Sequence, residues 1–543
     1  MPKDNPNSPS EHESALDLRV QLEGVHNRRA FLALMGKGLG FSALAATLPG
    51  CGGGSGDGGT TTPPPPANTL PAASAEYTAL KRTSFGVHRD ALAAIQSMGI
   101  NAYLETQLDY QNIDDSDLEA TIQTRFPLTL QSPAQLITGF PDNIANVARE
   151  MISATQFRQI YSQRQLYEVM VEFWSDHFNI HLLNGLGPTL KPEDDQQVIR
   201  THALGNFRDL LGASARSPAM LFYLDNFYNV ATAPNENYAR ELMELHTLGV
   251  NGGYTEQDVK EVAKCFTGWS IRFPDDTSGA YGTYKYVDPV HDNGVKNVLG
   301  NTINAGGGEM DGEQVLDILA THPSTARFIA TKLCRRFNSD DPDSASIDTV
   351  AAAFTATNGD IKATLRALFN TPAFTDTADQ KFCRPSEYLA GTIRALAPES
   401  TYPSDDGLLF FYAQSILGQL PFYWPTPDGY PDKQSYWANT GGLLNRWRLS
   451  FLSYAPYIPS LNVFAIDYTT ILGGADTIES IIDTLVDKIL MRPLHSTDRT
   501  SMIDWLVVEI GYLPTDVLPS GLPEQVAPLV AAVLISSAYF HLR

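Results

Sequence analysis

Apolar residues recur every three or four positions along most of the chain after about residue 75, with charged and polar residues between them. This is the period of an amphipathic helix, so the pattern predicts a mainly α-helical fold. The clearest runs predict two or three short helices over 74–108, one long helix with room for one break over 143–178, two helices over 311–337, two over 346–374, and a C-terminal helix over 522–542.

Local start and stop signals divide these runs. Within 311–337 the split falls at His322–Pro323, and Ser324 is the predicted N-cap of the second helix. Within 346–374 the Asn-Gly-Asp sequence is the predicted turn. The C-terminal run has charge and proline upstream of it, so we interpret it as part of the core rather than as a membrane span.

One stretch does not follow the helical period. Residues 269–300 contain Gly and Asp turn residues and alternating aromatic residues at Tyr284 and Tyr286. Such a pattern is typical of a short β-hairpin. The predicted fold class is therefore mainly α, an irregular multi-helix bundle with a small β-hairpin insertion near 270–300.

The N-terminal region has the character of a targeting segment. Residues 1–27 are polar, and Arg28 and Arg29 then precede a mildly apolar run that ends in LPGC at Cys51. The run is too short and too rich in Gly and Ala for a good spanning helix. It resembles a twin-arginine export signal ending in a lipobox, in which Cys51 would be acylated and become the mature N-terminus. The alternative is an ordinary cleaved signal in which the cysteine occurs by chance.

A segment rich in Gly, Ser and Pro follows over 51–75, and this composition is typical of a flexible and then extended tether. No linker of comparable length comes later, so residues 76–543 are predicted to form a single helical domain. We therefore expect an exported protein that is lipid-anchored in the bacterial cell envelope. Folded-state export often serves cofactor loading, although proteins without a cofactor use the same route.

The chain is acidic, with a formal net charge of −23. Such a surface repels nucleic acid and anionic lipid, so we expect no nucleic-acid partner and membrane contact only through the N-terminal lipid. Three cysteines remain after Cys51, and none has CxxC spacing: Cys265, Cys334 and Cys383. They predict neither a disulfide framework nor a cysteine zinc site.

Two histidines lie four residues apart in FWSDHFNIH. On a helical wheel His177 falls in the middle of the apolar arc and His181 lies about 40° away. The opposite face, predicted to be solvated, consists of Glu168, Glu172, Ser175 and Asn179. The spacing lets both imidazoles reach one metal ion. The alternative is a pair of core histidines bonded to neighbouring groups, or a His181 just past the helix end.

Residues 234–269 predict a helix–loop–helix unit with an unusually placed carboxylate. Glu241 falls inside the apolar stripe of the first helix, and Glu244 lies at its margin. A buried carboxylate needs a partner, because a buried charge without one destabilises the fold by on the order of several kcal/mol. An arginine, a histidine such as His177, and a metal ion are the alternatives.

Two further stretches carry candidate chemistry. His291 and Asp292 lie in the turn-rich sequence VDPVHDNG, where they are candidates for a metal or polar site, although Asp-Asn-Gly is also ordinary turn chemistry. Tyr423, Trp424 and Trp437 lie in an irregular aromatic stretch and are candidates for stacking on sugar rings; the alternative is packing over the core. No GxSxG, P-loop, Rossmann or haem CxxCH motif occurs.

Six segments in order carry a family resemblance: KRTSFG, FWSDHFNIH, NENYARELMELHTLGVNGGYTEQDVKEVAKCFTGW, HDNGVKNVLG, HPSTARFIATKLCRRF and LGQLPFYWPTPDGY. From about residue 75 onward the chain resembles the bacterial family called domain of unknown function 1800. The resemblance implies an exported, largely helical protein without an established activity. Such proteins are commonly encoded beside those of domain of unknown function 1501, which resemble alkaline phosphatases and sulfatases. The family loop reads close to PPNVKGW, so WPTPDGY departs from it at Tyr430.

Three hypotheses follow for the function. In the first, the chain is a non-catalytic partner or scaffold for an exported phosphatase- or sulfatase-like protein of the kind just named. In the second, it is a metal-dependent hydrolase in which a divalent metal activates water. The ligands would then be His177 and Glu241, with His181, Glu244 and His291 as further candidates. In the third, it is a glycan-binding module that uses the aromatic stretch.

Overall fold

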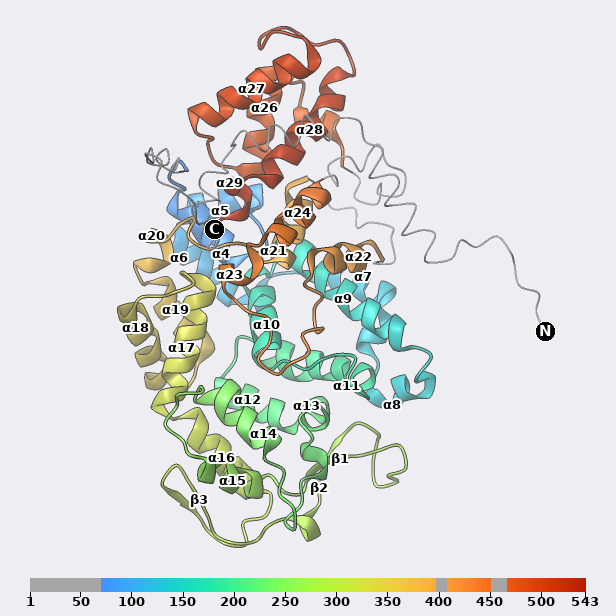
Figure 1. Ribbon diagram of the computed structural model, residues 1–543, viewed down its shortest axis with the longest axis vertical. Helices are drawn as coiled ribbons and strands as arrows, with labels where there is room; N and C mark the ends of the chain where they lie inside the picture. The colour runs from blue at the N-terminus through green and yellow to red at the C-terminus, as the bar shows by residue number, and fades with distance from the viewer. Residues whose placement is uncertain (1–69, 397–407, 451–465) are drawn as a thin grey trace, which may run out of the picture. The chain divides into compact units, whose positions relative to one another are not determined.

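The computed structural model describes residues 70–396, 408–450 and 466–543 (Figure 1). The described chain is largely helical, and its strands form two antiparallel sheets of two strands each. The predicted mainly α fold class is therefore confirmed. Arg28 and Arg29 of the export signal, the lipidation candidate Cys51 and most of the tether lie outside the described residues.

The chain divides into two compact units. The larger unit takes its described residues from Ser74–Gly391, Asp406–Tyr436 and Arg543, and the smaller unit from Thr392–Asp405, Trp437–Leu542 and the segment before Ser74. The expectation of a single domain over 76–543 stays a prediction.

The larger unit holds most of the helices. Its elements are α4 (Ala75–Thr83), α5 (Arg89–Met98), α6 (Ile100–Leu108), η1 (Tyr110–Asn112), α7 (Ser116–Arg125), η2 (Pro127–Leu130), α8 (Pro133–Leu136), η3 (Ile137–Gly139), α9 (Ile144–Tyr161), α10 (Gln165–His177), α11 (Gly187–Asp194), η4 (Asp195–Arg200), α12 (Phe207–Arg216), α13 (Pro218–Tyr223), η5 (Asn226–Tyr228), α14 (Glu236–Glu241), η6 (Leu242–Thr247), α15 (Glu256–Cys265), η7 (Asp288–Val290), α16 (Met310–Ala320), α17 (Pro323–Phe337), α18 (Ser344–Ala356), α19 (Ile361–Phe369), α20 (Ala373–Asp376) and α22 (Leu408–Leu417). Two of these, η4 and η6, are π-helical.

The smaller unit is also helical. Its elements are α24 (Thr440–Leu449), α25 (Tyr468–Leu472), α26 (Ile478–Leu485), the π-helical η10 (Val486–Leu490), α27 (Ser496–Ile510), α28 (Leu522–Ser536) and α29 (Ala538–His541). Two helices, α21 (Pro385–Leu396) and α23 (Gln434–Trp437), begin in the larger unit and end in the smaller one. Most of α28 is buried, as predicted for a core helix. In the part of the chain that the structure describes, no helix is long and apolar enough to cross a membrane.

The strands form the predicted hairpin and a second one with a shorter turn. β1 (Trp269–Ile271) pairs with β2 (Tyr284–Tyr286), with Trp269 opposite Tyr286. β3 (Lys296–Val298) pairs with β4 (Asn301–Ile303). The two residues between β3 and β4 both have positive φ, 51° at Leu299 and 78° at Gly300. Positive φ at both positions is the backbone of a tight two-residue hairpin turn, whose twist matches that of the strands.

Of two predictions about the helices, the structure confirms one and contradicts the other. The long helix predicted over 143–178 is broken once, between α9 and α10. The N-cap predicted at Ser324 is wrong, because the cap of α17 is His322, whose Nδ1 accepts a hydrogen bond from the backbone N of Ser324 at 3.1 Å. Pro323 occupies the first helical position, where its missing N–H costs nothing, and this places the cap one residue before it.

The solvated face predicted for α10 is a second correction. Glu168 and Asn179 are buried, and Glu172 and Ser175 are half-buried. Glu168 pairs with Arg200 of η4, and the Asn179 amide donates to the carbonyl O of Trp424 at 2.9 Å. The helix is therefore covered on both faces, by apolar side chains on one and by charged and polar partners on the other.

Candidate functional site

A row of carboxylates runs along one face of α10. Glu168, Glu172 and Asp176 are spaced four residues apart, so they lie above one another on the helix surface. At the start of the row, Arg200 places Nη1 3.0 Å from Glu168 and Nε 2.9 Å from Asp195. The π-helical turn η4 ends at Arg200 and carries both residues of that second pair.

Arginines from other elements meet the rest of the row. Arg384 ion-pairs with Glu172 and places Nη1 2.7 Å from Asp176. Arg336 of α17 places Nη2 2.8 Å from Glu387, which also pairs with Arg543. Burial alone would raise the pKa of Glu387, but Arg543, Arg336 and Arg384 outweigh it and lower that pKa to about 2. This network is a set of paired charges in the interior.

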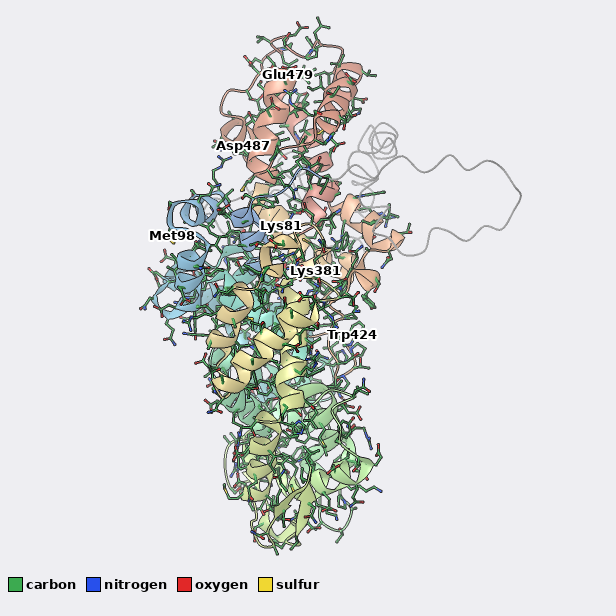
Figure 2. All side chains as sticks on the ribbon, turned by 90° about the vertical axis from the view of Figure 1, so that its left-hand side faces the viewer. Lys81, Met98, Lys381, Trp424, Glu479 and Asp487 are labelled. Carbon is green, nitrogen blue, oxygen red and sulfur yellow. The ribbon has the colours of Figure 1, made fainter. Side chains whose placement is uncertain are left out.

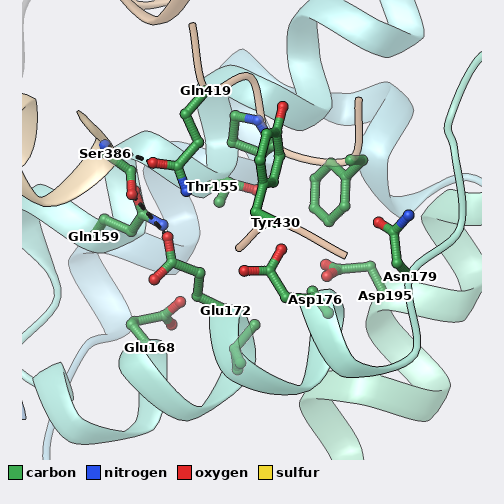
Figure 3. Close-up of a pocket in the computed structure, with 14 residues that line it drawn as sticks. Thr155, Gln159, Glu168, Glu172, Asp176, Asn179, Asp195, Ser386, Gln419 and Tyr430 are labelled. Carbon is green, nitrogen blue, oxygen red and sulfur yellow. Dashed lines mark hydrogen bonds between the residues drawn. The ribbon is translucent and has the colours of Figure 1, made fainter. Parts of the chain in front are cut away.

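A cavity of about 30 Å³ lies beside the carboxylate row, which is room for about one water molecule. Figure 3 shows Glu168, Glu172, Asp176 and Asp195 around it, with Tyr430 and Gln419 on other walls. Arg200 and Arg384 take up the charge of these four carboxylates. Nowhere in residues 70–396, 408–450 and 466–543 do three or more His, Cys, Asp or Glu side chains form a group that could hold a metal ion.

His177 lies in the interior, and both of its ring nitrogens are occupied. Nε2 is 3.0 Å from the carbonyl O of His246 in η6. A carbonyl oxygen only accepts, so the imidazole carries its proton on Nε2. Nδ1 then has a lone pair, which accepts a hydrogen bond from Nζ of Lys332 at 2.9 Å. Burial, and then the charges of Lys332 and His246, hold the pKa of His177 well below its usual range.

Glu241 ends α14, and Glu244 lies in η6, the π-helical turn that also carries His246. Glu241 is half-buried, and burial and the charge of Glu244 raise its pKa. Glu244 pairs with Arg240, whose Nη1 is 3.7 Å away. The contacts of His177 are the His246 carbonyl and Lys332, so the structure does not bring His177 and Glu241 together as partners.

The remaining sequence candidates are dispersed. His181 lies past the end of α10 and is half-exposed, with its ring centroid 6.1 Å from that of Tyr423. His291 is buried, with Nε2 3.2 Å from Asp311, whose carboxylate is also 2.6 Å from Nζ of Lys296. The side chain of Asp292 accepts from the backbone N of Gly294 at 2.8 Å, which is turn chemistry.

A larger cavity, of about 270 Å³, opens at the other end of the row. Its charged lining comes from α10, α17 and the segments around them: Asp176, Lys332, Arg335, Arg336, Arg384, Asp428, Asp432 and Lys433. We call it the basic cavity, because five of these side chains are cations and three are carboxylates. Most of the cations have an acidic partner; Lys433, for example, is 2.7 Å from Asp341.

Two cations of the basic cavity differ from the others. Among the described residues, neither Lys332 nor Arg335 has a carboxylate within ion-pair distance; Lys332 donates to His177, and Nε of Arg335 donates to the carbonyl O of Asp340 at 3.1 Å. Both lie on α17 and are three residues apart, so their side chains share one face of the helix. Burial lowers the pKa of Lys332 to about 8, against the opposing charges of Asp176 and other acids.

The residues of the aromatic stretch differ in burial. Phe422 is buried in a core cluster with Leu136 and Leu182, and Tyr423 packs against that cluster. Trp437 is buried, with 5% of its surface exposed, whereas Trp424 is half-buried. Of the three stacking candidates, therefore, Trp437 lies in the core.

The loop 424–433 is fixed against the end of α10. Besides its bond to Trp424, the Asn179 amide donates to the carbonyl O of Thr426 at 2.7 Å. Gly429 has a φ of +72°, and a Cβ there would lie 2.0 Å from the backbone O of Asp176. Only glycine fits this close approach.

The charged lining of the basic cavity was missed by sequence reasoning. The sequence pattern predicts only a helix for the segment that carries Lys332, Arg335 and Arg336. One signal was present: Arg336 follows Ile329 by seven residues, so it lies on the apolar face of α17, where it is almost fully buried.

Comparison with known proteins adds one finding. A family model described as "Protein of unknown function (DUF1800)" matches residues 78–540. No curated protein and no solved structure matches the chain.

Proposed function

The chain belongs to the DUF1800 family of proteins of unknown function, and we propose that it is an exported binding protein whose basic cavity holds an anionic ligand. The observation that carries this proposal is the pair of cations on α17, Lys332 and Arg335. They line a cavity of about 270 Å³ and, within the described part of the chain, have no carboxylate partner.

The energetics favour an anion at this place. A partly buried cation without a counter-charge is costly, and the lowered pKa of Lys332, about 8, is the expected consequence. An anion between Lys332 and Arg335 would supply the missing charge and accept hydrogen bonds from both side chains.

The lining also limits the ligand. The volume of about 270 Å³ is close to the lower end of the usual range for small-molecule sites, about 300 Å³, so the ligand is small. Asp428 and Asp432 share the lining, and they would repel a ligand of high negative charge. A monoanion such as a carboxylate or a sulfate ester fits, and hydroxyl groups on it could donate to these carboxylates.

The cellular location and the partner protein are also proposals. The resemblance to a twin-arginine lipoprotein signal around Arg28, Arg29 and Cys51 supports anchoring in the cell envelope. The family resemblance supports a role beside an exported phosphatase- or sulfatase-like protein of domain of unknown function 1501. Such enzymes act on anionic esters, so a binding protein for anions would suit that role. No observation favours the metal-dependent hydrolase in the same way, because both ring nitrogens of His177 are occupied.

Isothermal titration calorimetry tests the proposal. We expect acetate and methyl sulfate each to bind the full-length protein at one site at pH 7, while glycerol, a neutral compound of similar size, does not bind. The double substitution Lys332→Met and Arg335→Met should abolish binding of both anions. Absence of anion binding to the unchanged protein, or equal binding by the double variant, would overturn the proposal.

A further inference from the structure

We propose that the ligand of the basic cavity is an anionic sugar, and that its ring packs on the aromatic side chains at the rim of the cavity. This inference rests on the proposed function, because the acidic group of the sugar would occupy the place between Lys332 and Arg335. It adds a second subsite, made of Trp424, Tyr430 and Tyr436, which we call the aromatic rim.

The aromatic rim is a compact cluster formed by the loop 424–433 and the short helix α23 that follows it. The ring centroid of Trp424 lies 5.0 Å from that of Tyr430 and 5.7 Å from that of Tyr436. Trp424 is half-buried, and 45% of the surface of Tyr436 is exposed. Figure 2 shows Trp424 at the outer edge of the ribbon. Part of this aromatic surface is therefore exposed to solvent, and exposed apolar patches often mark binding sites.

The rim and the basic cavity are continuous. Tyr430 belongs to the rim and also lines the cavity. Asp428 lines the cavity as well, and its Oδ1 accepts a hydrogen bond from the indole Nε1 of Trp424 at 2.8 Å. A ligand that reaches from Lys332 to Trp424 would therefore pass along Asp428 and Tyr430 without leaving the site.

The chemistry of such a path is that of a sugar with an acidic group. Aromatic faces carry partial negative charge and attract the C–H edges of a pyranose ring. Asp428 is an exposed acceptor and suits hydroxyl donors, whereas an aromatic or aliphatic ligand would leave its carboxylate facing apolar atoms. Lys332 and Arg335 suit the acidic group. Few other small molecules combine one apolar face, several hydroxyl donors and one negative charge.

The aromatic rim is held in place before a ligand arrives. Asn179 bonds to two carbonyl groups of the loop, and Gly429 lies against the backbone of Asp176. The indole of Trp424 is oriented by its bond to Asp428. A rigid aromatic surface loses little conformational entropy on binding, which makes even a small stacking surface effective.

Paired ligands separate the two subsites. We would titrate the full-length protein with glucuronate and acetate, and with glucose 6-sulfate and methyl sulfate, at pH 7. In each pair the sugar should bind about tenfold more tightly than the anion without a ring. Which pair binds better tells whether the acidic group is a carboxylate or a sulfate, and either result supports the inference.

A rim variant and its control complete the test. Trp424→Leu keeps an apolar side chain and should remove the advantage of the sugar, and a far-ultraviolet circular dichroism spectrum like that of the unchanged protein shows that the variant is folded. Trp505→Leu, which replaces a half-buried tryptophan of the smaller unit, should leave the advantage of the sugar intact. If sugars bind no more tightly than ring-free anions, or if Trp424→Leu leaves their advantage intact, the inference fails and the proposed function stands. If no anion binds, both fail.

Discussion

Nζ of Lys332 lies 2.9 Å from Nδ1 of His177, and this contact links two segments 155 residues apart in the chain. The imidazole is neutral and its Nε2 proton is engaged by the carbonyl of His246, so it offers Lys332 a lone pair and no charge. His177 thereby holds the amine in position on the wall of the basic cavity without neutralising it. The amine is left to pair with an anion from outside.

Removal of this amine gives the first prediction. Lys332→Met should weaken binding of acetate by about 10- to 100-fold, because a hydrogen bond to a charged group contributes about 1.5–3 kcal/mol. Lys433→Met is the matched control, since Lys433 lines the same cavity but is already paired with Asp341. Calorimetry should show a much smaller loss for the control. Equal losses in the two variants would mean that the cavity acts only through its total charge.

The second prediction concerns pH. In the unbound protein the pKa of Lys332 is about 8, and a bound anion would raise it. Below about pH 8 the amine already carries its proton, so acetate affinity should be nearly constant. Above about pH 8 binding must take up a proton, so the Kd should rise by up to about tenfold per pH unit. Asp176, whose pKa burial raises to about 6, remains ionised across this range.

Lys332→Arg separates this titration from other causes. Arginine keeps its charge at every pH of the experiment, so the variant should bind acetate with little change between pH 7 and pH 9. Calorimetry at both pH values measures it. A fall in affinity that is as steep in the variant as in the unchanged protein would assign the pH dependence to another group.

The carboxylate row of α10 gives a prediction about stability. Arg200→Met should lower the free energy of unfolding by about 3–5 kcal/mol, because it leaves Glu168 and Asp195 buried without their cation. Arg327→Met is the control, since Arg327 and Asp348 form a pair in which both side chains are more than half exposed, and such pairs contribute at most about 1 kcal/mol. Urea unfolding followed by tryptophan fluorescence compares them. Similar midpoints for the two variants would contradict a structural role of the row.

A pair of glycines tests how the loop is seated. Gly429→Ala should lower the melting temperature and weaken acetate binding, because its Cβ would lie 2.0 Å from the backbone O of Asp176. Gly418→Ala has the same unfavourable positive φ, +81°, but no atom lies within 4 Å of its Cβ. The control therefore measures backbone strain alone. If both variants have the same melting temperature and bind acetate equally, the close approach at Gly429 does not position the cavity wall.

The sequence predicted the helical architecture and the hairpin because both depend on local periodicity. It failed on the polar face of α10, since a wheel shows that Glu168 is polar but not that Arg200 meets it inside the protein. Buried ion pairs and solvated charges give the same one-dimensional pattern. The misplaced cap of α17 was a local error of a different kind, in which Pro323 moved the cap to His322.

The sequence predicted only part of the candidate site. The central position of His177 on an apolar arc correctly indicated a buried imidazole. Its partner could not be inferred, because Lys332 and the carbonyl of His246 become neighbours only through the packing of α10, η6 and α17. A backbone carbonyl group is present at every residue, so side-chain identities cannot show which one a histidine contacts. The sequence therefore suggested Glu241 as a partner instead.

The most direct measurement of the central claim is the anomalous scattering of bromide, a monoanion, in crystals of the protein. We predict one strong bromide peak in the basic cavity, in contact with Nζ of Lys332 and the guanidinium of Arg335. In Lys332→Met crystals that peak should weaken strongly. A saturated crystal with no bromide in the cavity, or with an unchanged peak in the variant, would contradict the account.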